Sequence, residues 1–345
     1  MNSIANLPLI SIVIPNHNGC GFLEKCLQSL HGQTYKKMEI IVVDNGSQDG
    51  SPEMVQADAP EIILLKKDRN LGFGGAVNAG IRSSRGSWIA VLNNDTEAPS
   101  DWLEECARAI QDHPDAAFFA CRILDFSNHD RIYSAGDCYL RAGIGYRRGQ
   151  EREDRADFHR ECRIFSASGC AAMYRRQVLE EMGGFDERFF AYLEDVDLGL
   201  RLQTAGLHGY YIPRAEVYHH GAATSGGEFS RLAVRLRTRN SLLLLLKSLP
   251  AKFLFRCCPM IVLAQLSWIL RILAHWRLGS YLRGLGGAFV LAPAMIRDRA
   301  LLRASWRSSG QRLWQEILKS ESLARDDFAG TGPGSLFLKW YFRIF

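Results

Sequence analysis

The chain has 345 residues, of which 47% are hydrophobic and 23% are charged, so it can hold a catalytic domain with an appendage and is too apolar to be disordered. The net charge of +5 hides a division. Residues 1–230 hold 23 Lys and Arg against 32 Asp and Glu, a balance of −9, whereas residues 231–345 hold 19 against 5, a balance of +14. This division indicates two parts with different tasks.

The first hundred residues alternate strand-like and helix-like stretches. Short β-branched runs predict buried strands at 10–15, 39–43, 62–65 and 87–92. Apolar residues at helical spacing predict helices at 21–31 and 74–81, with another helix beginning near 49–51. This order predicts an α/β, Rossmann-like fold with a mostly parallel sheet, in which ligands bind at the carboxyl ends of the strands.

The middle of the chain is less regular. Residues 125–163 are polar and predict loops or weak antiparallel strands. Beyond them we expect a strand at 165–174, a helix at 177–182, a charged segment at 185–205 and short strands at 210–213 and 216–218.

From residue 230 onward, leucine-rich stretches alternate with isolated Arg and Lys. The uncharged run Cys257–Leu270 has 14 residues, and we expect it to be too short to span a bilayer, which takes about 20. A second apolar stretch, 284–296, is also short. Basic helices with Trp268, Trp276 and Trp306 predict an anchor that lies on a membrane surface. The alternative is a helical cap that packs its leucines on the catalytic domain or on a second subunit.

Two classes of segment are not expected. The nine cysteines are scattered and form no CxxC pair, which favours reduced thiols in a cytosol over a zinc site or a disulfide framework. The first 15 residues have no basic residue before the apolar run, and two prolines interrupt it, so we expect no signal peptide.

Polar residues directly follow three of the predicted strands, as Asn16-His17-Asn18, Asp44-Asn45 and Asn93-Asn94-Asp95. A carboxylate at a strand end can hold a divalent cation that bridges a diphosphate. Asp44 can instead accept a hydrogen bond from a ribose hydroxyl or a base N–H. The alternative at each site is turn chemistry that only ends the strand.

A glycine-rich loop, residues 69–75, precedes a predicted helix. Its small residues allow backbone N–H groups to approach a ligand, and a helix N-terminus favours anions. The loop contains Asn70 and Gly72, and Asn78 follows one turn later to contact the ligand or to cap the helix.

Two further pairs carry titratable groups. Glu194 and Asp195 lie among aromatic residues, where burial can raise the pKa of a carboxyl toward that of a general base, unless they are only helix-start acids. Asp197 and Arg201 have the spacing of a surface ion pair. His219-His220 ends a short strand and can complete a metal shell with Asp95, or simply be polar surface.

Together these motifs resemble family 2 glycosyltransferases of the GT-A fold, most closely the bacterial rhamnosyltransferase-like members. The resemblance covers about residues 8–228. It is carried, in order, by SIVIPNHN at 11–18, EIIVVDNGSQDGS at 39–51, NLGFGGAVNAGI at 70–81, VLNNDT at 91–96, SGCAAMYRR at 168–176, GGFDERFFAYLEDVDLGLRLQTAG at 183–206 and VYHHGAATS at 217–225.

The resemblance implies roles for individual residues. Asp195, with Glu194 beside it, would be the general base, and Asp95 with His219, rather than His220, would hold a divalent metal, Mg²⁺ or Mn²⁺. The donor-binding residues would be Pro15, Asn16, Asn18, Asp44, Asn70, Gly72, Asn78, Asn93 and Asn94. The family's D-x-D element begins here with Asn93, which keeps an oxygen acceptor and removes a charge.

The implied function is inverting, metal-dependent transfer of rhamnose or a hexose in cell-surface polysaccharide synthesis. The sugar would pass from a nucleoside-diphosphate sugar to a glycan or a polyprenyl-diphosphate-linked acceptor. We expect a catalytic domain at 1–228 and a basic helical region at 229–345. We also expect a cytoplasmic protein, peripheral at the inner face of the bacterial membrane. Nucleic acid is not an expected partner, because leucine and tryptophan dominate between the rear charges.

Two other functions share this fold. A non-catalytic sugar-nucleotide-binding regulator would retain the sheet, but the joint presence of the two acids and the histidine argues against it. A nucleotidyltransferase would carry a basic residue in a glycine-rich loop after the first strand, where this chain reads PNHNGCG.

Overall fold

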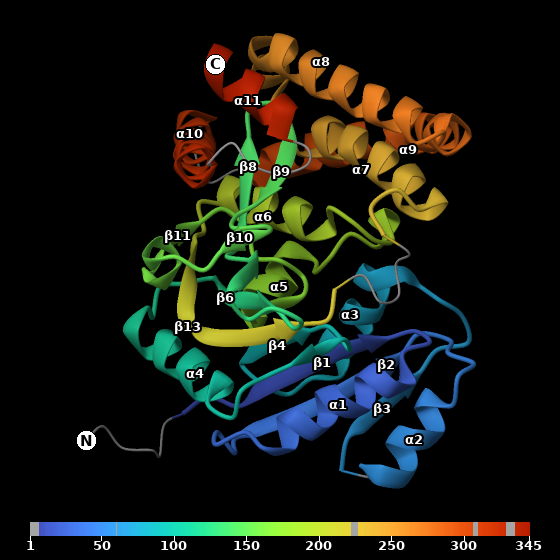
Figure 1. The fold of residues 1–345 in the computed structure, drawn as a ribbon, viewed down its shortest axis with the longest axis vertical. Helices are drawn as coiled ribbons and strands as arrows, with labels where there is room; N and C mark the ends of the chain where they lie inside the picture. The colour runs from blue at the N-terminus through green and yellow to red at the C-terminus, as the bar shows by residue number, and fades with distance from the viewer. Residues whose placement is uncertain (1–6, 60, 222–226, 306–309, 329–334) are drawn as a thin grey trace.

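The computed structural model describes residues 7–59, 61–221, 227–305, 310–328 and 335–345. Figure 1 shows a central sheet flanked by helices, with the C-terminal helices gathered at one end, far from the first strands of the sheet. Trp306, one of the three tryptophans of the predicted membrane anchor, lies outside the described residues, as do residues 222–225 of the motif VYHHGAATS.

The predicted α/β fold is confirmed in the first hundred residues. The parallel strands lie in the order β3-β2-β1-β4. They are β1 (Ile10–Asn16), β2 (Met38–Asp44), β3 (Ile63–Lys66) and β4 (Trp88–Leu92). The intervening helices are α1 (Cys20–His31), α2 (Ser51–Asp58) and α3 (Gly72–Ser83). Every residue of β4 is buried, as its uninterrupted apolar sequence predicts.

An antiparallel half continues the sheet beyond β4, through β12, β6, β7 and β10. The chain forms β5 (Thr96–Glu97), α4 (Trp102–Asp112), β6 (Phe118–Asp125), β7 (Arg131–Ser134), β10 (Arg152–Glu153), η2 (Ala156–His159), β11 (Cys162–Ile164), β12 (Ala171–Arg175) and α5 (Arg176–Met182). The short strands within 125–163 agree with the weak antiparallel strands expected there. They include a separate hairpin, β8 (Asp137–Leu140) and β9 (Ile144–Arg147).

One long strand replaces two predicted short ones. β13 (Gly209–His219) runs parallel to β6 and antiparallel to β5 and β11. Its register with β6 shifts between Ile212 and Glu216, around Pro213, which has no N–H to donate to the ladder. The shift explains why the sequence pattern indicates two strands.

Five C-terminal helices follow α6 (Glu194–Thr204). They are α7 (Arg231–Ser248), α8 (Ala251–Ala274), α9 (Leu278–Ser305), α10 (Gly310–Asp327) and α11 (Ser335–Ile344). Helix α10 packs on the hairpin and, like α7, on α6, whereas α9 packs on α7 and α8. Three leucines of α7, Leu243, Leu244 and Leu245, are buried in one cluster with Tyr139, Phe165 and Phe189 of the preceding part. The leucines of α7 therefore form part of the core of the catalytic half.

The expectation that the apolar run at 257–270 is too short to span a bilayer was wrong, because the run is part of a longer helix. α8 has 24 residues, because the helix continues through the basic residues that flank the uncharged run. In the described part of the chain it is the one helix long and apolar enough to cross a membrane. Its sequence still has two faces, since the buried residues are Phe253, Cys257, Ala264 and Ile272.

Candidate active site

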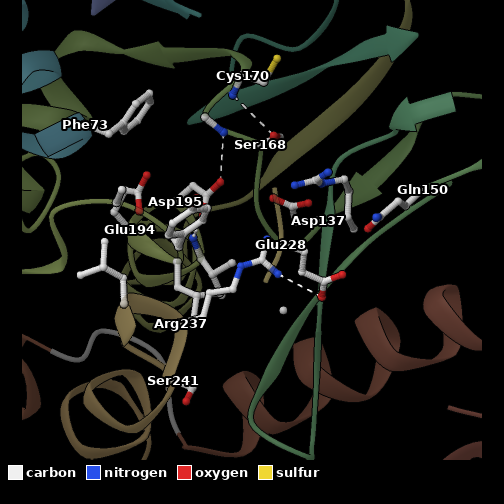
Figure 2. A pocket seen from close by; sticks show the side chains of 18 of the residues that line it. Phe73, Asp137, Gln150, Ser168, Cys170, Glu194, Asp195, Glu228, Arg237 and Ser241 are labelled. Carbon is white, nitrogen blue, oxygen red and sulfur yellow. Dashed lines mark hydrogen bonds and ion pairs between the residues drawn. The ribbon is translucent and has the colours of Figure 1, made fainter. Parts of the chain in front are cut away.

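A cleft of about 1200 Å³ lies between the carboxyl ends of the parallel strands and the helices α7 and α8. All predicted site residues line it except Asn18, Asp44 and Asn78. Figure 2 shows Asp195, Asp137, Glu228 and Arg237 around this cavity.

The strand ends form one polar wall of the cleft. Asn94 donates a hydrogen bond from Nδ2 to Oδ1 of Asn16 at 2.6 Å. Asn16 in turn lies opposite Asp44 in the β1–β2 ladder and donates to Oγ of Ser47 at 3.2 Å. The asparagines at these strand ends are therefore held in a fixed arrangement.

Asp44 and Asn18 lie behind this wall. Oδ2 of Asp44 accepts the Ser47 N–H at 3.2 Å, while Oδ1 is buried and has no hydrogen-bond partner among the described residues. A buried acceptor without a donor is costly, so Asp44 suits a ligand that donates a hydrogen bond. Asn18 is exposed, and its Oδ1 accepts the Gln48 N–H at 2.8 Å, which fastens two loops together.

The glycine-rich loop is tied to the end of β2 by Asn45, a residue absent from the predicted site. Its Nδ2 donates to Oδ1 of Asn70 at 3.0 Å and to the carbonyl of Gly72 at 3.1 Å. Gly72 has φ +77°, and a Cβ there would lie 2.3 Å from the carbonyl oxygen of Phe190. The glycine thus permits contact between this loop and the loop that carries the acids.

Asn78, which was predicted to bind the donor, does not line the cleft. It is buried in α3, where Nδ2 donates to the Phe185 carbonyl at 2.8 Å and to Oε1 of Glu187 at 3.1 Å. Its Oδ1 accepts the Phe185 N–H at 2.9 Å. The amide is used to hold the segment before α6.

Asp95 and His219 are 124 residues apart in the chain and form a buried pair, with Nε2 of His219 3.0 Å from Oδ1 of Asp95. The β5–β13 ladder brings them together. The distance is that of a hydrogen bond, and Nδ1 of His219 is buried without a partner among the described residues. A carboxylate oxygen and an imidazole nitrogen are also the atom types that ligate divalent cations, so the chemistry of the pair suits one.

The described residues contain no group of three or more His, Cys, Asp and Glu side chains placed to hold a metal ion. Phosphate oxygens and water would have to supply the other ligands, as is usual for Mg²⁺. His220 points to a different partner, because its Nε2 lies 3.0 Å from Oε1 of Glu97 and its ring stacks on Phe126 at 3.7 Å.

The acidic pair begins α6 after a strained loop. The backbone is left-handed at Phe190, Tyr192 and Leu193, with φ of 65°, 69° and 69°, which is unfavourable for side chains of this size. Asn240 of α7 stabilises this loop by donating from Nδ2 to three carbonyls, those of Phe189, Ala191 and Tyr192, at 2.7 to 3.0 Å. A residue of the basic rear segment thus positions the acids.

The carboxylate of Asp195 is held by two backbone donors. Oδ2 accepts the Gly169 N–H at 3.1 Å and Oδ1 accepts the Val196 N–H at 2.8 Å; Figure 2 shows the side chain beside Glu194. A carboxylate has about four lone-pair sites. Each oxygen therefore keeps a site for a hydroxyl of a bound substrate.

Two neighbouring carboxyls have different properties. Burial, and then the charge of Asp195, raise the pKa of Glu194 to about 8, as the aromatic surroundings predict. The same causes raise the pKa of Asp137 to about 8. Asp137 begins the β8 hairpin and carried no signal in the sequence. Both groups therefore hold a proton near neutral pH.

The raised pKa of Glu194 predicts a loss of stability with increasing pH. A carboxyl with a folded pKa of about 8 and an ordinary value of 4.5 stabilises the fold fully below the lower value and loses this contribution as pH rises toward the higher one. Glu194→Gln should therefore have a melting temperature equal to that of the wild type at pH 5. At pH 9 it should exceed the wild type by at least about 1–2 °C, the shift per kcal/mol that an unfolding entropy of about 2.1 cal/mol/K per residue gives for this chain. Glu181→Gln, an exposed change on α5, should show no such pH dependence, and equal melting at pH 9 would contradict the assignment.

Asp197 forms a buried ion cluster, not the surface pair expected from its spacing. It is fully buried, and its Oδ2 lies 2.9 Å from Nε of Arg201 and 2.7 Å from Nζ of Lys247. Lys247 belongs to α7 and also contacts Asp186 at 2.7 Å. The surface prediction failed because residue spacing within one helix cannot show a cation that comes from another.

Comparison with known proteins identifies the family of this chain. The pattern of the family described as "Glycosyl transferase family 2" matches residues 11–183, half of the chain. The chain belongs to this family. It is therefore a glycosyltransferase, as the motifs predict.

A relative from Mycobacterium tuberculosis (strain CDC 1551 / Oshkosh) is the N-acetylglucosaminyl-diphospho-decaprenol L-rhamnosyltransferase, 30% identical over 241 residues that cover 63% of this chain and 78% of the relative. The O-antigen biosynthesis protein RfbC of Myxococcus xanthus is 29% identical over 64% of this chain and 18% of its own length. The fold is similar to that of a mannosyltransferase from Pyrobaculum calidifontis in complex with GDP-Man and Mn²⁺, with a TM-score of 0.51 and 18% identity over 93% of this chain and 87% of that one.

Proposed function

We propose that this glycosyltransferase moves rhamnose or a hexose, with inversion, from a nucleoside-diphosphate sugar to a sugar carried on a polyprenyl diphosphate. The observation that carries the proposal is that Asp195 and the Asp95–His219 pair line the same cleft. The rhamnosyltransferase relative, whose name specifies a decaprenyl-diphosphate sugar as acceptor, supports this substrate class.

In this mechanism Asp195 accepts the proton of the acceptor hydroxyl, which then attacks the anomeric carbon. The two backbone N–H groups on the carboxylate keep it in place while the proton moves. Asp95 and His219 would hold the divalent cation, which when bound offsets the charge that develops on the leaving nucleoside diphosphate. The strand-end residues Asn16, Asp44 and Asn94 would orient the nucleotide.

The decisive experiment measures transfer and binding with the full-length protein. Transfer from dTDP-rhamnose and a set of UDP-hexoses to a synthetic N-acetylglucosaminyl-diphosphoprenol should be observed with Mg²⁺ or Mn²⁺ and not with chelator. The preferred donor should also raise the melting temperature in the presence of the metal, because a ligand of the folded state stabilises it by mass action. Donor binding without any turnover would favour the regulator instead.

The acceptor class implies a membrane surface, and the rear helices carry exposed apolar stripes. On α8 the exposed residues recur every three to seven positions, as Phe255, Val262, Leu266, Leu270 and Leu273, which places them on one face. Similar stripes occur on α9, with Leu282, Phe289 and Ile296, and on α11, with Leu336, Trp340 and Ile344. Figure 1 shows α8 at the outer end of the molecule.

We therefore place the protein on the inner face of the bacterial membrane, with α8 lying along the surface. The anionic lipids of that leaflet attract each nearby basic residue by about 1 kcal/mol, and the rear segment has a charge of +14. The opposite face of α8 is buried against the protein, which favours a helix lying on the bilayer over one that crosses it.

Replacing Phe255, Leu266 and Leu270 together with serine should lower the affinity for phosphatidylethanolamine–phosphatidylglycerol vesicles by well over tenfold. Each buried apolar side chain contributes about 1.5–3 kcal/mol, and all three are exposed in the free protein. Vesicle sedimentation measures the effect, and the apolar triple variant Phe255→Leu, Leu266→Ile, Leu270→Ile is the control. Undiminished binding of the serine variant, or retention of the wild type in membranes at alkaline pH, would contradict a surface anchor.

A further inference from the structure

The wall of the cleft formed by α7 and α8 is basic and has few counter-charges. From residue 229 to 297 the chain contains eleven Lys and Arg and no Asp or Glu. Four arginines of these helices line the cleft: Arg235, Arg237, Arg239 and Arg271. Arg239 is used structurally, because its guanidinium donates to the carbonyls of Arg188 and Phe189.

Two of these guanidinium groups share a single carboxylate oxygen. Oε1 of Glu228 lies 3.4 Å from Nη1 of Arg237 and 3.1 Å from Nη2 of Arg271. Figure 2 shows Arg237 and Glu228 joined in the cavity. Two cations facing one monoanion leave a net positive charge, and Glu228 itself is 40% exposed. An anion with more charge can therefore replace this carboxylate.

Aromatic rings hold the two guanidinium groups in place. Arg237 lies over the ring of Tyr192 at 5.0 Å, and Arg271 lies over Phe229 at 5.0 Å. Tyr192 is three residues before Asp195, so the basic wall adjoins the loop that carries the proposed base. Stacking fixes the planes of the guanidinium groups while their N–H donors remain available to an anion.

The same wall becomes apolar toward α8. Leu232, Leu236, Ala264 and Trp268 line the cleft beside the arginines, and the exposed stripe of α8 continues outside it. A ligand with an anionic group attached to a hydrocarbon chain matches this arrangement, in which a basic surface is followed by an apolar one. The donor diphosphate is a poorer match, because its proposed cation ligands lie at the strand ends.

We propose that Arg237 and Arg271 form a subsite for the diphosphate of the lipid-linked acceptor, with Glu228 as the group that this diphosphate displaces. The subsite rests on the proposed function, since it places the acceptor sugar at Asp195 and the prenyl chain along α8. Guanidinium groups bind phosphate oxygens through paired N–H donors, and two of them match the two phosphates.

The first test compares two acceptors with the same sugar, one linked to its lipid through a diphosphate and one an alkyl glycoside. In full-length protein, Arg237→Gln should lower the ratio of kcat/KM for the diphosphate acceptor to that for the glycoside by about 10–100-fold, the effect of losing a charged hydrogen bond. Arg231→Gln, which removes an exposed charge from the same helix, should leave the ratio unchanged. Equal losses with both acceptors would overturn the proposal.

The second test does not depend on turnover, so it separates failure of the subsite from failure of the proposed function. Geranyl diphosphate is titrated into protein saturated with nucleoside diphosphate and Mn²⁺. Arg237→Gln should weaken its binding more than tenfold, whereas Glu228→Gln should strengthen it, because the internal competitor loses its charge. Opposite signs are not expected of residues that only support the fold. Unchanged affinity in Arg237→Gln, or a weaker nucleotide affinity in its place, would overturn the proposal.

Discussion

Asp195→Asn is expected to lower kcat by about 10²–10⁴-fold, the usual contribution of a general base. The amide has the shape of the carboxylate, and its oxygen can accept one of the two backbone hydrogen bonds that now come from Gly169 and Val196. It cannot accept a proton from the acceptor hydroxyl. Steady-state transfer of the labelled sugar measures the loss, and the melting-temperature shift with donor and metal shows whether the donor still binds.

The matched control for this change is Glu181→Gln, which neutralises an exposed acid on α5 and should keep the wild-type kcat. Transfer by Asp195→Asn within a few fold of the wild-type rate would show that another group takes the proton. Asp137 would then be the next candidate, because the variant removes the charge of Asp195, which is one of the two causes that raise the pKa of Asp137.

The site residues that lie at the ends of strands could be predicted from the sequence. Asn16, Asn94 and Asp95 come immediately after buried strands, and the edge where parallel strands end is common to them all. Their meeting in one cleft therefore needs only the order of the strands. His219 also ends a strand, but the sequence does not show that β13 pairs with β5, and here the family resemblance identified it.

Other site residues depend on packing between distant segments. The pKa of Asp137 is raised by burial and by the nearby charge of Asp195. The residues around Asp137 in the sequence predict neither its burial nor its closeness to Asp195. Asn240 lies in the middle of a leucine-rich basic helix, where an amide has no evident task until three carbonyls of the acid loop are seen to face it. Asn78 is the reverse case. Its place near a glycine-rich loop predicted a contact with the donor, but its amide forms hydrogen bonds with the backbone of Phe185.

The change in net charge near residue 230 does not separate two parts with different tasks. The rear segment does carry the exposed apolar faces expected of a membrane anchor. Its first helix, however, also lines the cleft and supports the acid loop. A net charge sums over all faces of a segment, so it cannot distinguish arginines directed at lipid from those directed at a substrate cavity. Truncation at residue 230 would therefore remove the support of the acid loop together with the proposed anchor, and point substitutions are the cleaner test.

The largest effect on stability is expected for Lys247→Met. Lys247 is buried, and its Nζ contacts both Asp186 and Asp197 at 2.7 Å. Removing one partner of a buried ion pair costs about 3–5 kcal/mol, because the charges that remain are uncompensated. With an unfolding entropy of about 2.1 cal/mol/K per residue, the melting temperature of this 345-residue chain should fall by roughly 4–7 °C, as measured by calorimetry at neutral pH.

The pH dependence distinguishes this charge effect from a packing defect. Burial alone would raise the pKa of Asp197 and Asp186, but Lys247 and the neighbouring arginines, Arg201 and Arg188, outweigh it and hold both pKa values below their ordinary range. A lowered folded pKa contributes stability above the ordinary value of 3.8, and this contribution is lost as pH falls through the folded pKa. The difference between Lys247→Met and the wild type should therefore shrink below about pH 4. Lys319→Met, at an exposed ion pair on α10, should change stability by no more than about 0.5 kcal/mol. A destabilisation of Lys247→Met that stays constant from pH 7 to pH 3 would instead indicate a steric cause, and the link between α7 and the acidic helix would not be electrostatic.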